Sequence, residues 1–169
     1  MKHADALAIA QELVVQFTPY CQRIEIAGSV RRQKPDVKDI EICAMPRLEL
    51  GGLFGDPISA LAAFDYSQLG RVIKGGQRYV QIALHQQINL DLFLVLPPAT
   101  WGVIFTLRTG PADFSTHCVT QRSKGGLLPS YLAVRDGVVW QNDQSVPTPE
   151  EADFFRVLEL AWIPPHQRR

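Results

Sequence analysis

Two acidic residues separated by one isoleucine, in the segment Asp39-Ile40-Glu41, are of a type and spacing that could bind a cation. Acidic and apolar residues alternate here, so a strand would place Asp39 and Glu41 on one face and Ile40 on the other. Two neighbouring carboxylates repel each other, so their charges must be separated by solvent or balanced by a cation. The pair alone leaves both explanations open.

A third carboxylate, Asp91, is the only charged residue in the apolar run 88–96. Burying an unpaired carboxylate is costly, so Asp91 must be protonated, paired with a base or bound to a metal. A structural salt bridge to Arg78 is the alternative to a metal. Considered with Asp39 and Glu41, three carboxylates on strands of one sheet predict a site for a hard divalent cation.

A Gly-Ser turn, Gly28-Ser29, precedes the acidic pair. A glycine at the end of a strand allows a ligand to approach the backbone, and a following helical turn presents N–H groups to anions. Ser29 can donate a hydroxyl hydrogen bond, and Arg32 falls on the same face of such a turn. Such turns are common in proteins without a ligand. Together with the acidic pair, this one predicts a site for a nucleotide carried by magnesium.

Alternating helix and strand patterns could position these residues. Predicted helices cover residues 7–17, 58–69, 99–107, 112–123 and 148–160; predicted strands cover 23–27, 38–44, 77–84 and 88–96, with a small hairpin at 134–141 and a loop at 51–57. The strands 77–84 and 88–96 should form a hairpin over the polar turn 85–87. The last helix should begin with Thr148 as its N-cap, followed by a first-turn proline and a capping-box glutamate. The more helical pattern after Pro97-Pro98 places a lobe boundary near 106–110.

Composition restricts the class of protein. The 169 residues are 46% hydrophobic and 20% charged, which is typical of a globular chain. There is neither an apolar run long enough for a membrane span nor a secretory signal, so we expect no membrane partner. Three cysteines without CxxC spacing favour the cytoplasm or another reducing intracellular compartment and argue against zinc.

The net charge is zero, but the charge is unevenly distributed along the chain. Residues 68–135 hold seven basic and two acidic residues. Such a protein can bind a polyanion through one face, although a solvated surface would explain the same clustering.

These motifs resemble the nucleotidyltransferase superfamily and, within it, the X family of DNA polymerases, including its minimal viral member. The family pattern G-S-x-R-R matches residues 28–32, its acidic pair matches Asp39 and Glu41, and its third aspartate matches Asp91 in a strand that ends in proline. The turn that supports the incoming nucleotide is echoed by residues 107–111. The similarity continues through 124–128 and 150–168.

The resemblance implies an α+β fold, with a nucleotidyltransferase palm of mixed β-sheet flanked by helices and a small, mainly helical C-terminal lobe. Palm and lobe would cover residues 1–105 and 106–169, with no lyase or helix-hairpin-helix domain. The implied activity is DNA-directed DNA polymerisation, which transfers a deoxynucleotide from a dNTP to a primer 3′-hydroxyl in short-gap or repair synthesis. The implied partners are a dNTP and primer-template or gapped DNA. The protein would act as a monomer, and its origin could be viral or bacterial.

The resemblance also assigns residue roles. Asp39 and Glu41 would bind two Mg²⁺ ions, for which Mn²⁺ can substitute, and Asp91 would complete the catalytic ion's site and take or relay the proton. The expected nucleotide-binding residues are Gly28, Ser29, Arg32, Arg108, Thr109 and Gly110. Independently of the resemblance, the basic residues expected to contact DNA are Arg78, Arg122, Lys124 and the tail Arg168-Arg169, and an ordinary surface charge is the alternative for each.

Three departures from the family pattern leave alternatives open. Glu41 stands where relatives have aspartate, and Leu107-Arg108 replaces an aromatic pair near the sugar. The helix after Gly110 lacks the asparagine and arginine that relatives direct at the nascent base pair. The acceptor could therefore be RNA, a small molecule or a protein. A non-catalytic nucleic-acid-binding module is the third alternative.

Overall fold

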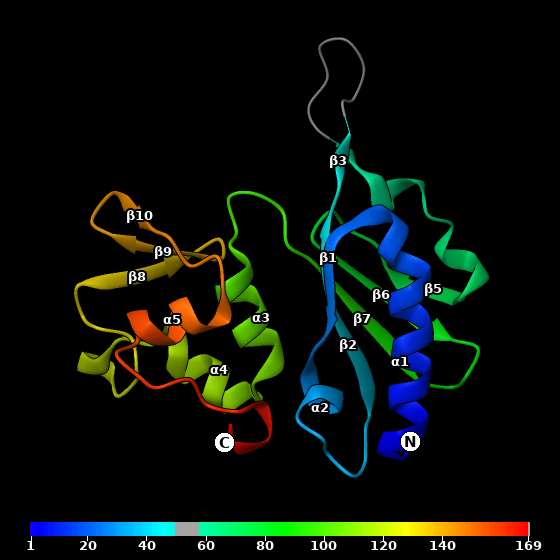
Figure 1. Cartoon of the computed structure of the whole chain (residues 1–169), viewed down its shortest axis with the longest axis horizontal. Coiled ribbons are helices and arrows are strands. Elements are labelled where there is room, and N and C mark those ends of the chain that lie inside the picture. The colour runs from blue at the N-terminus through cyan, green and yellow to red at the C-terminus, as the bar shows by residue number, and fades with distance from the viewer. Residues whose placement is uncertain (50–57, 169) are drawn as a thin grey trace. The chain divides into compact units, whose positions relative to one another are not determined.

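The computed structural model describes residues 1–49 and 58–168, and its chain divides into two compact units (Figure 1). Unit 1 comprises Met1–Ile26 and Pro35–Val95, and unit 2 comprises Ala27–Lys34 and Leu96–Arg169. The fold is α+β with a mixed sheet flanked by helices, which confirms that part of the predicted fold class. No helix in the described part of the chain is long and apolar enough to cross a membrane.

Unit 1 is built on a five-stranded sheet with the order β1-β2-β7-β6-β5. Its strands are β1 (Cys21–Ile26), β2 (Asp39–Pro46), β5 (Gly70–Lys74), β6 (Tyr79–Leu84) and β7 (Asn89–Leu94). β2 and β7 pair in parallel, and the other neighbouring strands pair antiparallel. The long helix α1 (His3–Phe17) contacts β1 and β2. The short strands β3 (Leu48–Glu49) and β4 (Ile58–Ser59) pair separately.

The three strands β2, β7 and β6 share one alternation of burial. Their even-numbered positions are apolar and buried: Ile40, Ile42, Ala44, Val80, Ile82, Leu84, Leu90, Leu92 and Leu94. Burying each such leucine or isoleucine contributes about 1.5–3 kcal/mol, so the register of these strands is strongly specified. The opposite face therefore presents the odd-numbered positions of all three strands.

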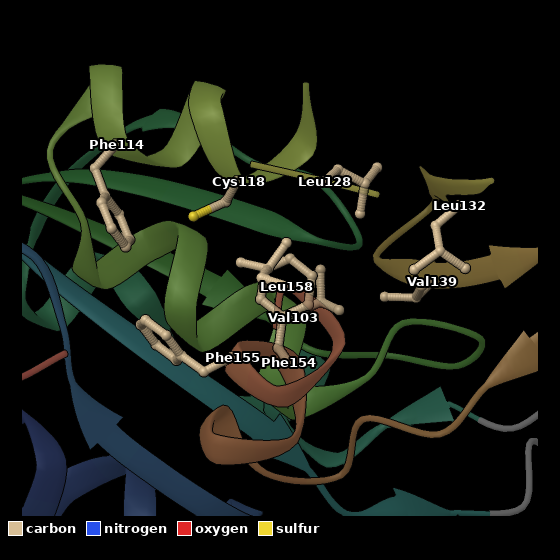
Figure 2. Close-up of a cluster of buried hydrophobic side chains, with 9 residues drawn as sticks. All are labelled: Val103, Phe114, Cys118, Leu128, Leu132, Val139, Phe154, Phe155 and Leu158. Atoms are coloured by element: carbon tan, nitrogen blue, oxygen red, sulfur yellow. The ribbon is translucent and has the colours of Figure 1, made fainter. Parts of the chain in front are cut away.

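Unit 2 combines helices with a three-stranded antiparallel sheet of order β10-β9-β8. Its elements are α2 (Gly28–Arg31), α3 (Trp101–Thr109), α4 (Ala112–Val119), β8 (Leu132–Arg135), β9 (Val138–Gln141), β10 (Gln144–Val146) and α5 (Glu151–Val157). Figure 2 shows its core, to which α3, α4, β8, β9 and α5 all contribute. The core side chains are Val103, Phe114, Cys118, Leu128, Leu132, Val139, Phe154, Phe155 and Leu158.

The predicted helix at 58–69 is wrong. This segment forms β4 followed by two 3₁₀ turns, Ala60–Ala63 and Tyr66–Gln68. Between them Phe64 is extended, with ψ 127°, and the Asp65 carboxylate accepts the Ser67 N–H at 3.0 Å to start the second turn. Phe64 packs edge-on against Phe17 at 4.9 Å. The two turns bury Leu61, Phe64 and Leu69 at a spacing close to that of a helix, which is why the sequence pattern predicted one.

The strands predicted at 23–27, 38–44, 77–84 and 88–96 are confirmed, as is the hairpin across Asp136-Gly137. β5 was missed because all its residues after Gly70 are exposed and show no alternation. The predicted loop at 51–57 lies outside the described residues.

The boundaries of two helices in unit 2 differ from the prediction. α5 is N-capped by Glu150, which forms a capping box with Asp153, whereas the predicted cap Thr148 is buried and its hydroxyl lies 2.7 Å from that of Thr100. Glu159, at φ 56°, ends the helical turn before Leu160. α4 ends at Val119 because the next residue, Thr120, is extended.

Candidate functional site

The three predicted carboxylates lie on two adjacent parallel strands. Glu41 on β2 is directly opposite Asp91 on β7, and Asp39 is opposite Asn89. Because paired strands lie about 4.8 Å apart, Glu41 and Asp91 are nearest neighbours across the ladder, and Asp39 follows two residues along the same face. All three residues are partly buried. The fold therefore brings these residues to one face of the central strands.

The backbone pairing of β2 and β7 places the three residues on one face, but it does not by itself bring their side chains together as metal ligands. Within residues 1–49 and 58–168, no group of three or more His, Cys, Asp or Glu side chains is arranged so that it could hold a metal ion.

Asp91 is held from the β6 side by two neutral donors. The Tyr79 hydroxyl donates to Oδ1 at 2.7 Å, and the Gln81 amide donates to the same oxygen at 2.9 Å. In the described part of the chain, no salt bridge joins Asp91 to Arg78, the alternative that the sequence offered. Arg78 is exposed just before β6 begins.

The Gly-Ser turn forms the short helix α2 in unit 2. Gly28 has φ 58°, a conformation that favours glycine, and its carbonyl accepts the Arg32 N–H at 3.0 Å. The Ser29 hydroxyl oxygen is buried and has no hydrogen-bond partner among the residues described. An unsatisfied buried hydroxyl costs about 1–3 kcal/mol, so this atom is a candidate ligand contact.

Two of the predicted nucleotide-binding segments meet in unit 2. Arg32 donates from Nη1 to the carbonyl oxygen of Thr109 at 2.5 Å, and Arg31 donates to the Thr109 hydroxyl at 2.7 Å. A side chain at Gly110 would collide with Phe114, whose nearest ring atom would lie 2.5 Å from the added Cβ. The turn 28–32 is thereby joined to the C-terminal end of α3, while Arg108 lies exposed in that helix's last turn.

Glu151, on the first turn of α5, links Arg31 to the C-terminal segment. Arg31 pairs with it in a bidentate manner, at 2.8 Å to Oε1 and 3.0 Å to Oε2, and Arg168 donates to Oε1 at 2.8 Å. Trp162 adds an indole N–H bond to Oε2 at 2.9 Å. The Arg31 guanidinium also lies 3.9 Å from the centroid of the Phe105 ring. Glu151 is therefore a structural centre of unit 2.

The electrostatics of Glu151 follow from these contacts. Burial by itself raises the pKa of this carboxyl, but the hydrogen bonds and charges of Arg168 and Arg31 lower it to about 2. From the sequence, Glu151 was expected only as the capping-box glutamate and Arg31 only as part of the G-S-x-R-R match, and their pairing was not predicted. The only local sign was a glutamate near a helix start, which capping explains equally well.

The predicted DNA contacts have different environments. Arg122 is exposed but bonds the Glu159 carboxylate at 2.6 Å and the Leu158 carbonyl at 2.7 Å, just after the end of α5. Lys124 is exposed in the 3₁₀ turn that follows α4. Arg168 is only 2% exposed and paired with Glu151, so its prediction as a DNA contact is wrong. Its neighbour Arg169 lies outside the described residues.

The three cysteines are free and buried. Burial raises the pKa of the Cys21 thiol to about 11 and that of Cys118 to about 12. Because the thiolate is the form that attacks substrates and binds metals, neither group is poised for such chemistry at neutral pH.

A search of known protein families found no match to this chain, and a search of curated proteins found no similar protein. The case for a function therefore depends on the residues themselves.

Proposed function

We propose that this protein is a nucleotidyltransferase of the X-family DNA polymerase type. It would add a deoxynucleotide from a dNTP to the 3′-hydroxyl of a primer and release pyrophosphate. The observation that carries this proposal is the register of Glu41 with Asp91 on adjacent parallel strands, with Asp39 on the same face.

The residue types suit a hard divalent cation such as Mg²⁺ or Mn²⁺, and their backbone register supports the proposal, although the side chains of the described residues do not form a ready group of three ligands. Three carboxylates supply only oxygen ligands, and Oδ2 of Asp91 accepts no hydrogen bond from any described residue. Asp39 and Glu41 would hold two ions, and Asp91 would complete the site of one of them. Bound there, the ions would act as Lewis acids on the attacking and leaving oxygens.

The chain's own groups would handle the proton and the triphosphate. As the primer oxygen bonds to the α-phosphorus, the bond from that phosphorus to the pyrophosphate oxygen breaks, and the hydroxyl proton passes to Oδ2 of Asp91. The unsatisfied Ser29 hydroxyl and the backbone at Gly28 would bind the outer phosphates. Arg32 would stabilise charge on the leaving pyrophosphate, with support from Thr109.

The proposal extends to the rest of the chain. The expected palm at residues 1–105 and nucleotide-binding lobe at 106–169 do not coincide with the two units, because a boundary at 105/106 would cut α3. Unit 1 would therefore serve as the palm and unit 2 as the nucleotide-binding lobe, with Gly110 and Arg108 beside the nucleotide. Arg78 and Lys124 would contact primer-template or gapped DNA, and Arg122 would contribute through its remaining exposed surface. The enzyme would act as a monomer in short-gap or repair synthesis.

Transfer to another acceptor, such as RNA, a small molecule or a protein, is the second candidate. Two arginines of unit 2 that were expected to contact DNA favour this candidate, because they have other contacts. Arg168 is buried, and the Arg122 guanidinium bonds Glu159 and the Leu158 carbonyl, which leaves only part of it exposed to DNA. A non-catalytic module is less favoured, since it has no need of three carboxylates on one sheet face.

Primer extension tests the proposal. The protein would be incubated with Mg²⁺ and single-stranded, template-primer or gapped DNA, with deoxy- and ribonucleotides supplied separately. Asp91→Asn should abolish addition. Asp113→Asn, which changes an exposed aspartate of α4, should leave addition intact. Addition to RNA or a small molecule alone would support the second candidate, and addition to no acceptor would contradict both.

A further inference from the structure

Two side chains of the neighbouring strand β6 donate hydrogen bonds to Asp91, although the backbone ladder alone would hold this residue in the sheet. In the antiparallel ladder of β6 and β7, Gln81 is opposite Asp91 and Tyr79 is opposite Phe93. Paired residues point to the same face, so Gln81, Tyr79 and Asp91 all lie on the half-buried face of the sheet. Gln81 reaches Asp91 directly, and Tyr79 reaches it on the diagonal.

Both donors select the same carboxylate oxygen. Tyr79 and Gln81 each donate to Oδ1, at 2.7 and 2.9 Å, while Oδ2 has no donor among the described residues. The terminal torsion of an aspartate side chain is broad and two-fold, so without such bonds its two oxygens exchange readily. The shared bonds fix which oxygen remains open. Because both donors hold Oδ1 from β6, Oδ2 is the oxygen left for a ligand.

The Tyr79 donor is itself held in place. Its ring stacks on that of Phe93, with centroids 5.2 Å apart and an angle of 25° between the planes. The Lys74 ammonium lies 5.3 Å from the ring centroid. A ring packed in this way offers its hydroxyl at a fixed point, so little conformational entropy is lost when it bonds Asp91.

The neutrality of the two donors matters as much as their direction. A guanidinium or ammonium group on Oδ1 would cancel the charge of Asp91 and compete with any cation for it. A phenol and an amide orient the carboxylate and leave its negative charge intact. We infer that Tyr79 and Gln81 are positioning residues, which hold Asp91 with Oδ2 available to the divalent cation and the attacking hydroxyl. This inference rests on the proposed function.

Direct metal binding tests this role without turnover. Free Mn²⁺ would be measured by its paramagnetic resonance signal as wild type, Tyr79→Phe, Gln81→Met and the double variant are titrated, with no nucleotide or DNA present. Loss of one hydrogen bond to a charged group should weaken Mn²⁺ binding about fivefold, and loss of both should weaken it by more than tenfold. The matched controls Tyr131→Phe and Gln141→Met change exposed residues of unit 2 and should bind as wild type does.

Kinetics and urea unfolding of the same proteins separate positioning from a merely structural role. Positioning predicts a lower kcat and a higher Mg²⁺ requirement, with an unchanged KM for the nucleotide and a folded protein. If Tyr79→Phe unfolds, Gln81→Met still tests the role, because it keeps the side-chain volume and removes only the hydrogen bond to Asp91.

Two outcomes would overturn the inference, and they differ. If wild type binds Mn²⁺ and adds nucleotides but the folded variants match it in both, the positioning role is wrong and the proposed function stands. If wild type neither binds Mn²⁺ nor adds a nucleotide to any acceptor, the proposed function fails and the inference fails with it.

Discussion

Asp91 in unit 1 and Glu151 in unit 2 are both carboxylates on regular elements, yet the chain surrounds them in opposite ways. Glu151 uses both oxygens, and its donors are two guanidinium groups and an indole. Asp91 uses one oxygen, and its donors are an uncharged phenol and amide. Cationic partners satisfy a carboxylate completely and make it structural, whereas neutral partners orient it and leave it able to bind something else. Each difference predicts a different response to mutation.

Removing the charge of Glu151 should have the largest effect on stability. Glu151→Gln leaves Arg31 and the buried Arg168 without their anion, and breaking a buried pair in this way costs about 3–5 kcal/mol. Urea unfolding measures the loss. The matched control is Glu159→Gln, whose exposed pair with Arg122 should contribute less than about 1 kcal/mol. If Glu151→Gln and Glu159→Gln lose the same free energy of unfolding, Glu151 is not the structural centre of unit 2.

Acid should weaken the protein through the same residue. The folded-state pKa of Glu151 is about 2, below its ordinary value of 4.5, so the stability it contributes is present above pH 4.5 and is lost as the pH falls through 2. The lost contribution amounts to about 3 kcal/mol. The difference between wild type and Glu151→Gln in chemical unfolding should therefore shrink between pH 4.5 and 2. A difference that stays constant over this range would contradict the lowered pKa.

The indole partner of Glu151 should contribute a smaller amount. Trp162→Phe keeps an aromatic ring but loses the N–H bond to Oε2, which is worth about 1 kcal/mol at this half-exposed position. Trp140→Phe is the matched control, because the Trp140 indole bonds a backbone carbonyl at 3.4 Å. Thermal unfolding of the two variants should rank Trp162→Phe as the less stable.

The smallest effect on stability should come from Asp91→Asn. The amide oxygen of asparagine can still accept from Tyr79 and Gln81, so the free energy of unfolding should change by less than about 1 kcal/mol. Calorimetry of the variant measures this change. A loss as large as that of Glu151→Gln would show that Asp91 is a structural carboxylate after all.

The sequence predicted unit 1 well where burial alternates. β6 and β7 alternate throughout, and β2 alternates from Asp39 to Ile42 before Cys43 is buried as well; the odd-numbered residues Asp39, Glu41 and Asp91 share one face. The exposed strand β5 and the segment 58–69 lack a period that separates strand from helix, so tertiary contacts such as Phe64 with Phe17 decide their structure.

The partners of the key carboxylates were not predictable in the same way. Arg31 and Glu151 are 120 positions apart, and only the packing of α2 and α5 against α3 brings them together. The bonds from Tyr79 and Gln81 to Asp91 depend on the exact register of the β6–β7 hairpin. The alternation of apolar and polar residues does not determine that register, because a shift of two residues leaves every side chain on the same face.

The place of α2 in the fold has a consequence for synthesis of the chain. Residues 27–34 belong to unit 2, although the strands on either side of them, β1 and β2, belong to unit 1. On the ribosome Arg31 emerges long before Glu151, so its partly buried ion pair must wait for that residue. Contacts so distant in sequence are slow to form, so the nascent chain carries an unpaired arginine beside its Gly-Ser turn at least until Glu151 has emerged.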